Sequence, residues 1–106
     1  MSDQKLTIEE LFARLKQTAE AQTKNSYTVD LIKGGAEKIT RKVGEESVEV
    51  IIAAFLNEKN RTQKTHEDLV GEVCDLFYHS LVLLLSQNIE LDEILSELTK
   101  RNNKKK

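Results

Sequence analysis

The sequence predicts an all-α protein, a bundle of about four helices per chain that is completed by homodimerisation. The chain has no proline and only four glycines in 106 residues, and 39% of it is hydrophobic and 32% charged, a composition typical of helical bundles. Apolar residues recur at helical spacing in four segments. Because a chain of this length can bury only a modest core, we expect a single domain over residues 1–106.

The first helix is predicted to begin after Thr7. Thr7 and Glu10 form a capping-box pattern, in which each side chain accepts a hydrogen bond from the backbone of the other residue. Apolar residues then follow at helical spacing, which indicates an amphipathic helix that ends near Ala21. These residues are Ile8, Leu11, Phe12, Leu15 and Ala19.

A polar loop over residues 22–28 is expected next, with Thr28 as the cap of the following element. A short helical turn then meets Gly34 and Gly35, where we expect a kink because glycine costs about 1 kcal/mol in a helix interior. The second long helix is predicted from about Ala36 to Leu56, and residues 57–64 should form a polar connection.

The third helix is predicted to begin at Thr65, with Asp68 three residues on, and to end near Ser86 before Asn88. It is apolar on nearly all sides over residues 73–85, so we expect it to be central and close to the axis of a homodimer. A fourth helix should carry one apolar face, and residues 102–106 should form a disordered tail. The apolar residues of that face are Leu91, Ile94, Leu95 and Leu98.

Charge and composition exclude several functions. The net charge of −2 provides no general attraction for nucleic acid or an anionic membrane, so we expect neither as a partner. The sequence contains no uninterrupted apolar run of about 18–20 residues and no signal-peptide pattern, which favours a cytoplasmic protein. The single cysteine, Cys74, lies in an apolar segment and is expected to act as a small hydrophobe.

Two acidic pairs with the same spacing are the strongest functional signal. Glu46 and Glu49 lie about one turn apart on one helix, and Glu72 and Asp75 repeat the spacing after 22 intervening residues. Antiparallel helices would bring the four carboxylates together, although two such charges roughly 6 Å apart repel by about 3 kcal/mol at an effective dielectric of about 20. This pattern predicts a divalent cation, and Mg²⁺ with substrate phosphates suits oxygen ligands best.

Ordinary solvated helix charges are the competing interpretation. That interpretation fits Glu49 but not Glu46, which lies on an apolar stripe where an unpaired carboxylate is costly. His79 borders the acids of the third helix, and a hydrogen-bonded core histidine that orients a carboxylate is a simpler interpretation than a metal ligand. The apolar stripe beside Glu46 consists of Ile39, Val43, Val50 and Ala54.

With these residues the chain resembles the all-α nucleoside triphosphate pyrophosphohydrolases, the MazG-like superfamily. Within that superfamily it is similar to the phosphoribosyl-ATP pyrophosphohydrolases of histidine biosynthesis over about residues 8–101. The acid pairs identify the superfamily, and the other motifs are more selective. These motifs are Ser26-Tyr27-Thr28, Gly35, Lys38-Ile39, Lys42-Val43-Gly44-Glu45-Glu46, Glu49-Val50 and Asp75-Leu76-Phe77-Tyr78-His79.

The resemblance implies hydrolysis of phosphoribosyl-ATP between its α and β phosphates, which yields phosphoribosyl-AMP and pyrophosphate. It also implies a Mg²⁺ cofactor, and a separate chain for the following cyclohydrolase step. Ser47 stands where alanine is usual in the family, a small change that should leave the acids undisturbed.

The candidate residues can be assigned roles on this basis. The four acids Glu46, Glu49, Glu72 and Asp75 would hold Mg²⁺ and together with Glu45 form the catalytic group. Glu45 would act as general base or position water, with a plain surface charge as the alternative. The other candidates are substrate-binding residues, each with a structural alternative as a solvated charge, a helix-end charge or a packed loop residue. Lys38, Lys42 and Arg101 would contact phosphate and Tyr27 the ribose or base.

Two other functions remain open at this point. The first is a house-cleaning nucleoside triphosphate pyrophosphohydrolase with the same metal chemistry. The second is a non-enzymatic helical dimerisation protein, in which the acids would be surface charges.

Overall fold

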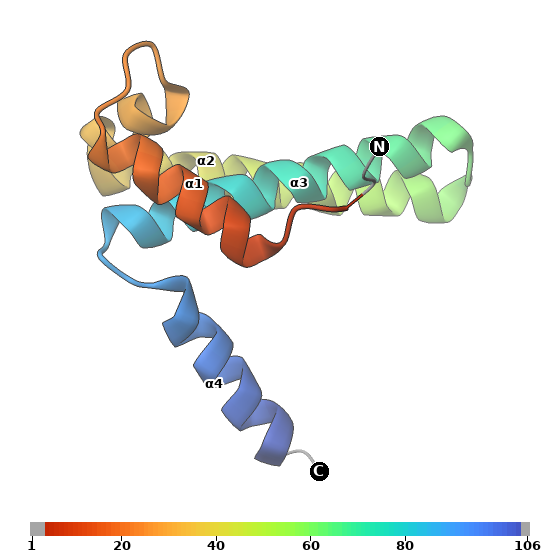
Figure 1. Cartoon of the computed structure of the whole chain (residues 1–106). Coiled ribbons are helices and arrows are strands. Elements are labelled where there is room, and N and C mark those ends of the chain that lie inside the picture. Colours follow the sequence, from red (N-terminus) through yellow and green to blue (C-terminus); the bar gives the residue numbers. More distant parts are fainter. Residues whose placement is uncertain (1–3, 105–106) are drawn as a thin grey trace.

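The computed structural model describes residues 4–104 and confirms the all-α class, since this range contains four helices and no strand (Figure 1). α1 is capped as predicted. The Glu10 N–H donates to Thr7 Oγ1 at 3.0 Å and the Thr7 N–H donates to Glu10 Oε1 at 2.8 Å. The helices are α1 (Ile8–Glu20), α2 (Tyr27–Lys59), α3 (Gln63–Ser86) and α4 (Leu91–Lys104).

α2 begins before the predicted cap. The Ser26 hydroxyl accepts from the Val29 N–H at 3.2 Å and caps the helix, so the expectation that Thr28 caps it was wrong. Thr28 is buried, and its hydroxyl is hydrogen-bonded to that of Tyr78 on α3. The predicted kink is present at Gly35, whose φ of 78° is a conformation that residues with a Cβ rarely adopt. The segment before Gly35 is thereby turned relative to the rest of α2.

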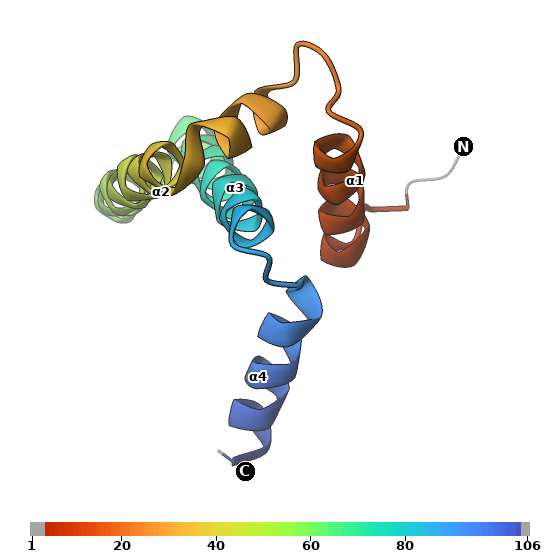
Figure 2. The same ribbon diagram turned by 90° about the vertical axis from the view of Figure 1, so that its left-hand side faces the viewer.

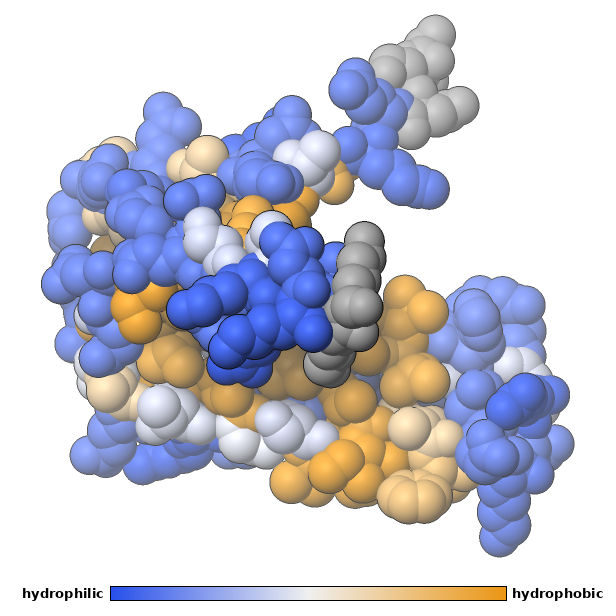
Figure 3. Space-filling view, turned by 90° about the horizontal axis from the view of Figure 1, so that it is seen from below, coloured by the Kyte–Doolittle hydropathy of each residue, from blue (hydrophilic) through white to orange (hydrophobic). Residues whose placement is uncertain are grey.

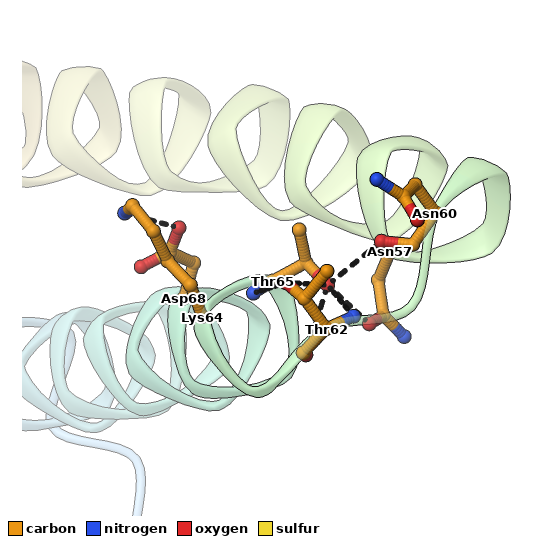
Figure 4. A network of polar contacts seen from close by, with 6 residues as sticks. All are labelled: Asn57, Asn60, Thr62, Lys64, Thr65 and Asp68. Carbon is orange, nitrogen blue, oxygen red and sulfur yellow. Dashed lines mark hydrogen bonds and ion pairs between the residues drawn. The ribbon is translucent and has the colours of Figure 1, made fainter.

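α3 also begins earlier than predicted. Thr62 is its N-cap, and Thr65, expected to start the helix, completes a capping box with Thr62. The Thr65 hydroxyl also bonds to Asn57 Oδ1 at 2.9 Å, which ties the end of α2 to the start of α3 (Figure 4). The connection is therefore shorter than residues 57–64, because these side chains satisfy the backbone groups at both helix ends.

α2 and α3 lie side by side as a long antiparallel hairpin, and α1 packs against its open end (Figures 1 and 2). One buried cluster joins α2 and α3 and consists of Leu31, Ile39 and Val82. A second cluster joins α1, α3 and the start of α4 and consists of Phe12, Leu81 and Leu91. On the far part of α2 the buried alanine is Ala53, whereas Ala54, which the predicted stripe included, is exposed.

α4 projects away from the other helices, so within one chain three helices pack together and the fourth is held mainly at its start (Figures 1 and 2). An ion pair of 2.9 Å between Lys16 and Glu90 supports this junction. Residues 102–104 of the expected tail are helical, and residues 105 and 106 lie outside the described residues.

α3 is less covered than a central helix would be. Of its side chains, those of His79, Leu81 and Val82 are buried, while Cys74, expected to act as a small hydrophobe, is exposed. Among the described residues α3 alone has the length and apolar composition that a membrane span also requires. Core helices of soluble proteins share these properties, so the absence of a membrane partner stays a prediction.

Candidate metal centre

The hairpin brings acids from α2 and α3 together at its middle. Glu46, Glu72 and Asp75 each offer a carboxylate oxygen, and these oxygens lie within 4.8 Å of one another. Glu46 comes from the face of α2 that also buries Ile39, which explains why a carboxylate occupies an otherwise apolar stripe. The expected convergence is therefore present for these three acids.

Glu49, the fourth predicted acid, lies at the edge of this cluster. Its side chain is exposed one turn after Glu46, and its carboxyl lies close enough to form a hydrogen bond with that of Glu72 when one of them is protonated. The structure therefore places Glu49 beside the three converging acids rather than within their tightest contact.

Two carboxylate oxygens of the cluster are buried and have no hydrogen-bond partner among the described residues. In the described part of the chain, Glu46 Oε1 and Glu72 Oε1 each expose less than 1 Å² and accept no hydrogen bond. Burying a carboxylate oxygen without a partner is costly, so most such atoms in folded proteins are paired. These two oxygens fit a missing cationic partner, and the oxygen-only set suits a hard cation such as Mg²⁺.

The same arrangement raises two pKa values. Burial raises the pKa of Glu46, and the charges of Glu49 and Asp75 raise it further, while His79 and Lys42 act in the opposite direction. Burial also raises the pKa of Glu72, followed by its hydrogen bond with Glu49 and the charges of the other acids. The fold thus holds these carboxylates together against desolvation and mutual repulsion.

His79 is hydrogen-bonded to the backbone of one acid of the cluster, Asp75. It is buried, and its Nδ1 lies 2.8 Å from the backbone carbonyl oxygen of Asp75, which can only accept, so Nδ1 carries the proton. Its Nε2 is hydrogen-bonded to the Tyr27 hydroxyl at 3.0 Å. Both ring nitrogens are engaged, in agreement with a hydrogen-bonded core histidine. Tyr27 is 47% exposed and also stacks on Tyr78, with ring centroids 6.0 Å apart.

The remaining predicted residues lie around or away from the acids. Lys42 is near Glu46 and forms an ion pair of 3.5 Å with Glu45, which is outside the three-acid cluster. Lys38 is exposed one turn earlier on α2. Arg101 forms an ion pair of 3.0 Å with Glu97 near the distal end of α4, so it is not brought to the acids within one chain.

A groove between α2 and α3 adjoins the acids and was missed by the sequence reasoning. It has a volume of about 320 Å³, and Glu49 and Glu72 form one of its ends. Its α2 side continues with Ile52 and Leu56, which follow Glu49 at helical spacing. This spacing was the only sign in the sequence that apolar side chains continue the face of Glu49. A groove also needs an opposing surface on α3, which the sequence does not show.

Comparison with known proteins agrees with the resemblance. The family model described as phosphoribosyl-ATP pyrophosphohydrolase matches residues 8–102. The phosphoribosyl-ATP pyrophosphatase of Clostridium novyi (strain NT) is 43% identical over 97 residues, covering 92% of this chain and 82% of that protein. The phosphoribosyl-ATP pyrophosphatase of Clostridium acetobutylicum is 44% identical over 99 residues, covering 90% of this chain and 84% of that protein. The phosphoribosyl-ATP pyrophosphatase of Bacillus cereus (strain AH820) is 43% identical over 101 residues, covering 92% of this chain and 88% of that protein. Because the match spans nearly the whole chain, this protein belongs to the phosphoribosyl-ATP pyrophosphohydrolase family, a family of hydrolases.

Proposed function

We propose that this chain hydrolyses phosphoribosyl-ATP between the α and β phosphates, using Mg²⁺ held by Glu46, Glu49, Glu72 and Asp75. The products would be phosphoribosyl-AMP and pyrophosphate, in a step of L-histidine biosynthesis. The pair of buried, unpartnered oxygens on Glu46 and Glu72 carries the proposal, because a cation is the partner that their shared environment lacks. When bound, Mg²⁺ supplies positive charge that offsets charge on the substrate phosphates.

The chain's own residues prepare this site. The hydrogen bond between Tyr27 and His79 and the one from His79 Nδ1 to the Asp75 carbonyl hold the turn of α3 that carries the Asp75 carboxylate. Such support limits the motion of a ligand side chain and preserves its geometry. Tyr27 also keeps part of its ring exposed, and we propose that this surface contacts the substrate.

Charged residues of α2 before the acids, and one of α4, would bind phosphate or orient water. Lys42 and Lys38 lie about one and two turns before Glu46 on α2, and they would bind phosphate oxygens as point charges. Glu45 is held beside Lys42 and would orient the attacking water or accept its proton. Arg101 would reach phosphate from a second subunit, since α4 projects away from its own hairpin.

A homodimer forms part of the proposal. Large apolar side chains on α2 and α3 are more than half exposed, and one side of the molecule shows a broad apolar region (Figure 3). Patches of this kind mark association surfaces. Sedimentation should give twice the chain mass, and Phe55→Lys should shift it toward the monomer. A monomeric wild type at all concentrations would contradict this part. The exposed residues include Val48, Ile51, Phe55, Val70 and Phe77.

Pyrophosphate release from phosphoribosyl-ATP tests the function. Wild type should be active with Mg²⁺ and inactive after chelation, and Glu72→Gln should lose at least about a hundredfold in kcat/KM, because it removes charge at the centre of the cluster. Glu67→Gln is the matched control, since Glu67 is an exposed acid of α3 that bonds to Gln63. Full activity of Glu72→Gln would refute the metal site. Faster turnover of deoxynucleoside triphosphates would favour the house-cleaning alternative.

A further inference from the structure

The groove beside the acids has a composition that suits one part of the substrate. From Glu72 to Thr65 on α3, seven residues span about 10 Å at 1.5 Å per residue, so the groove leads from the acids toward the hairpin tip. Its volume of about 320 Å³ is at the lower end of the range for small-molecule sites. Ile52 and Leu56 provide apolar surface that is 53% and 56% exposed.

The charges of the groove exclude a phosphate chain as its occupant. Its acidic lining residues are Glu49, Asp68 and Glu72, and no lysine or arginine among residues 4–104 lines it. An anion without bridging metal would be repelled, whereas a flat base would cover the apolar wall. Ribose hydroxyls and base N–H groups are donors that the Asp68 carboxylate can accept.

The opposite side of the acids has the complementary charge. Lys42 lies one turn before Glu46 on α2, on the side away from the hairpin tip. A polyphosphate that crosses the acids would therefore find a cation beyond them in this direction and apolar surface in the other. The two sides distinguish the two halves of a nucleoside triphosphate.

We propose that the groove between α2 and α3 binds the base and ribose of the nucleotide, with Asp68 and Leu56 as specificity-determining residues and pyrophosphate leaving on the Lys42 side. This inference rests on the proposed function, because the acids set the position of the scissile bond. It assigns a direction to the substrate along the hairpin.

Lys64→Ala is a matched control for Asp68→Ala. Its carboxylate forms an ion pair of 3.0 Å with Lys64, which is 83% exposed and does not line the groove (Figure 4). Asp68→Ala and Lys64→Ala therefore remove the same ion pair, but Asp68→Ala alone changes the groove. Asp68→Ala should raise KM for phosphoribosyl-ATP about tenfold, as expected for losing a hydrogen bond to a charged acceptor, and Lys64→Ala should leave it within about twofold.

Competitive inhibition by compounds that represent the two halves of the substrate's nucleoside triphosphate separates the two sides of the site. AMP represents the nucleoside half, and inorganic pyrophosphate represents the leaving half. Asp68→Ala and Leu56→Ala should raise the inhibition constant of AMP by about five- to tenfold and leave that of pyrophosphate unchanged. Lys42→Met should do the reverse.

The outcomes keep the inference distinct from the proposed function. A wild type that releases no pyrophosphate with Mg²⁺ would remove the function and the inference together. An active wild type would remove the groove assignment alone in any of three cases. These cases are that AMP does not inhibit, that the groove variants leave AMP inhibition unchanged, or that the groove variants weaken pyrophosphate inhibition by the same factor as AMP inhibition. Far-ultraviolet circular dichroism of each variant checks that the helices are retained.

Discussion

Replacing Glu46 with glutamine should stabilise the metal-free protein and remove its response to Mg²⁺. Glu46 is partly buried, one of its oxygens has no hydrogen-bond partner, and its carboxylate lies within 4.8 Å of that of Asp75. A glutamine side chain has nearly the same shape and lacks the charge, and its amide can donate to a neighbouring carboxylate. The variant therefore removes repulsion while it keeps the packing.

The expected gain in stability follows from the distance between the carboxylates of Glu46 and Asp75. Two unit charges 4.8 Å apart repel by about 3 kcal/mol at an effective dielectric of 20 and by about 1 kcal/mol in water. Because Asp75 is exposed, solvent screening favours the smaller value. A gain of about 1 kcal/mol corresponds to an increase in melting temperature of roughly 4 °C or more for a chain of this size.

Thermal unfolding with and without Mg²⁺ provides the assay, at one protein concentration. A ligand at about 100 times its dissociation constant stabilises the folded state by about 2.7 kcal/mol. Saturating Mg²⁺ should therefore raise the melting temperature of wild type above that of Glu46→Gln, and the order of the two proteins should invert. Glu37→Gln is the control, because Glu37 is an exposed acid of α2 that pairs with Arg41.

Two results would refute this reasoning. If Glu46→Gln lowers the melting temperature without metal, the carboxylate is not under repulsion. If Mg²⁺ stabilises wild type, Glu46→Gln and Glu37→Gln equally, the ion binds elsewhere.

Three further predictions concern stability. The raised pKa values of Glu46 and Glu72 mean that the metal-free folded protein binds protons more tightly than the unfolded chain, so its stability should increase from pH 7 toward the ordinary pKa of 4.5. Urea unfolding at several pH values measures this trend, which saturating Mg²⁺ should abolish. Gly35→Ala should destabilise the protein by about 1–3 kcal/mol, because φ is 78° and ψ is −174° there, and an unchanged urea midpoint would show that the kink relaxes. Thr28→Val removes the hydrogen bond to Tyr78 and should cost about 1 kcal/mol in the same assay, whereas a neutral result would mean that water satisfies the tyrosine.

Local features were predictable because short-range interactions decide them. Thr7 and Glu10 are three residues apart, so their capping box can be predicted from sequence and is present. Gly35 was identified as a kink for a similar reason. The capping of α2 and α3 was misjudged, since Ser26, Thr28, Thr62 and Thr65 are all chemically able to cap. Tertiary partners decide among such candidates, as the bond from Thr28 to Tyr78 shows.

By itself, the sequence determined the helical class, the family and the two acid pairs with their spacing, because helical periodicity places residues three apart on one face. Only the tertiary structure decided how the two helices align. That alignment brings Glu46 to Glu72 and Asp75 and leaves Glu49 at the edge. It also opens the groove toward Asp68 and directs α4 away from its own hairpin. These outcomes depend on the packing of apolar side chains from distant segments, which no local spacing specifies.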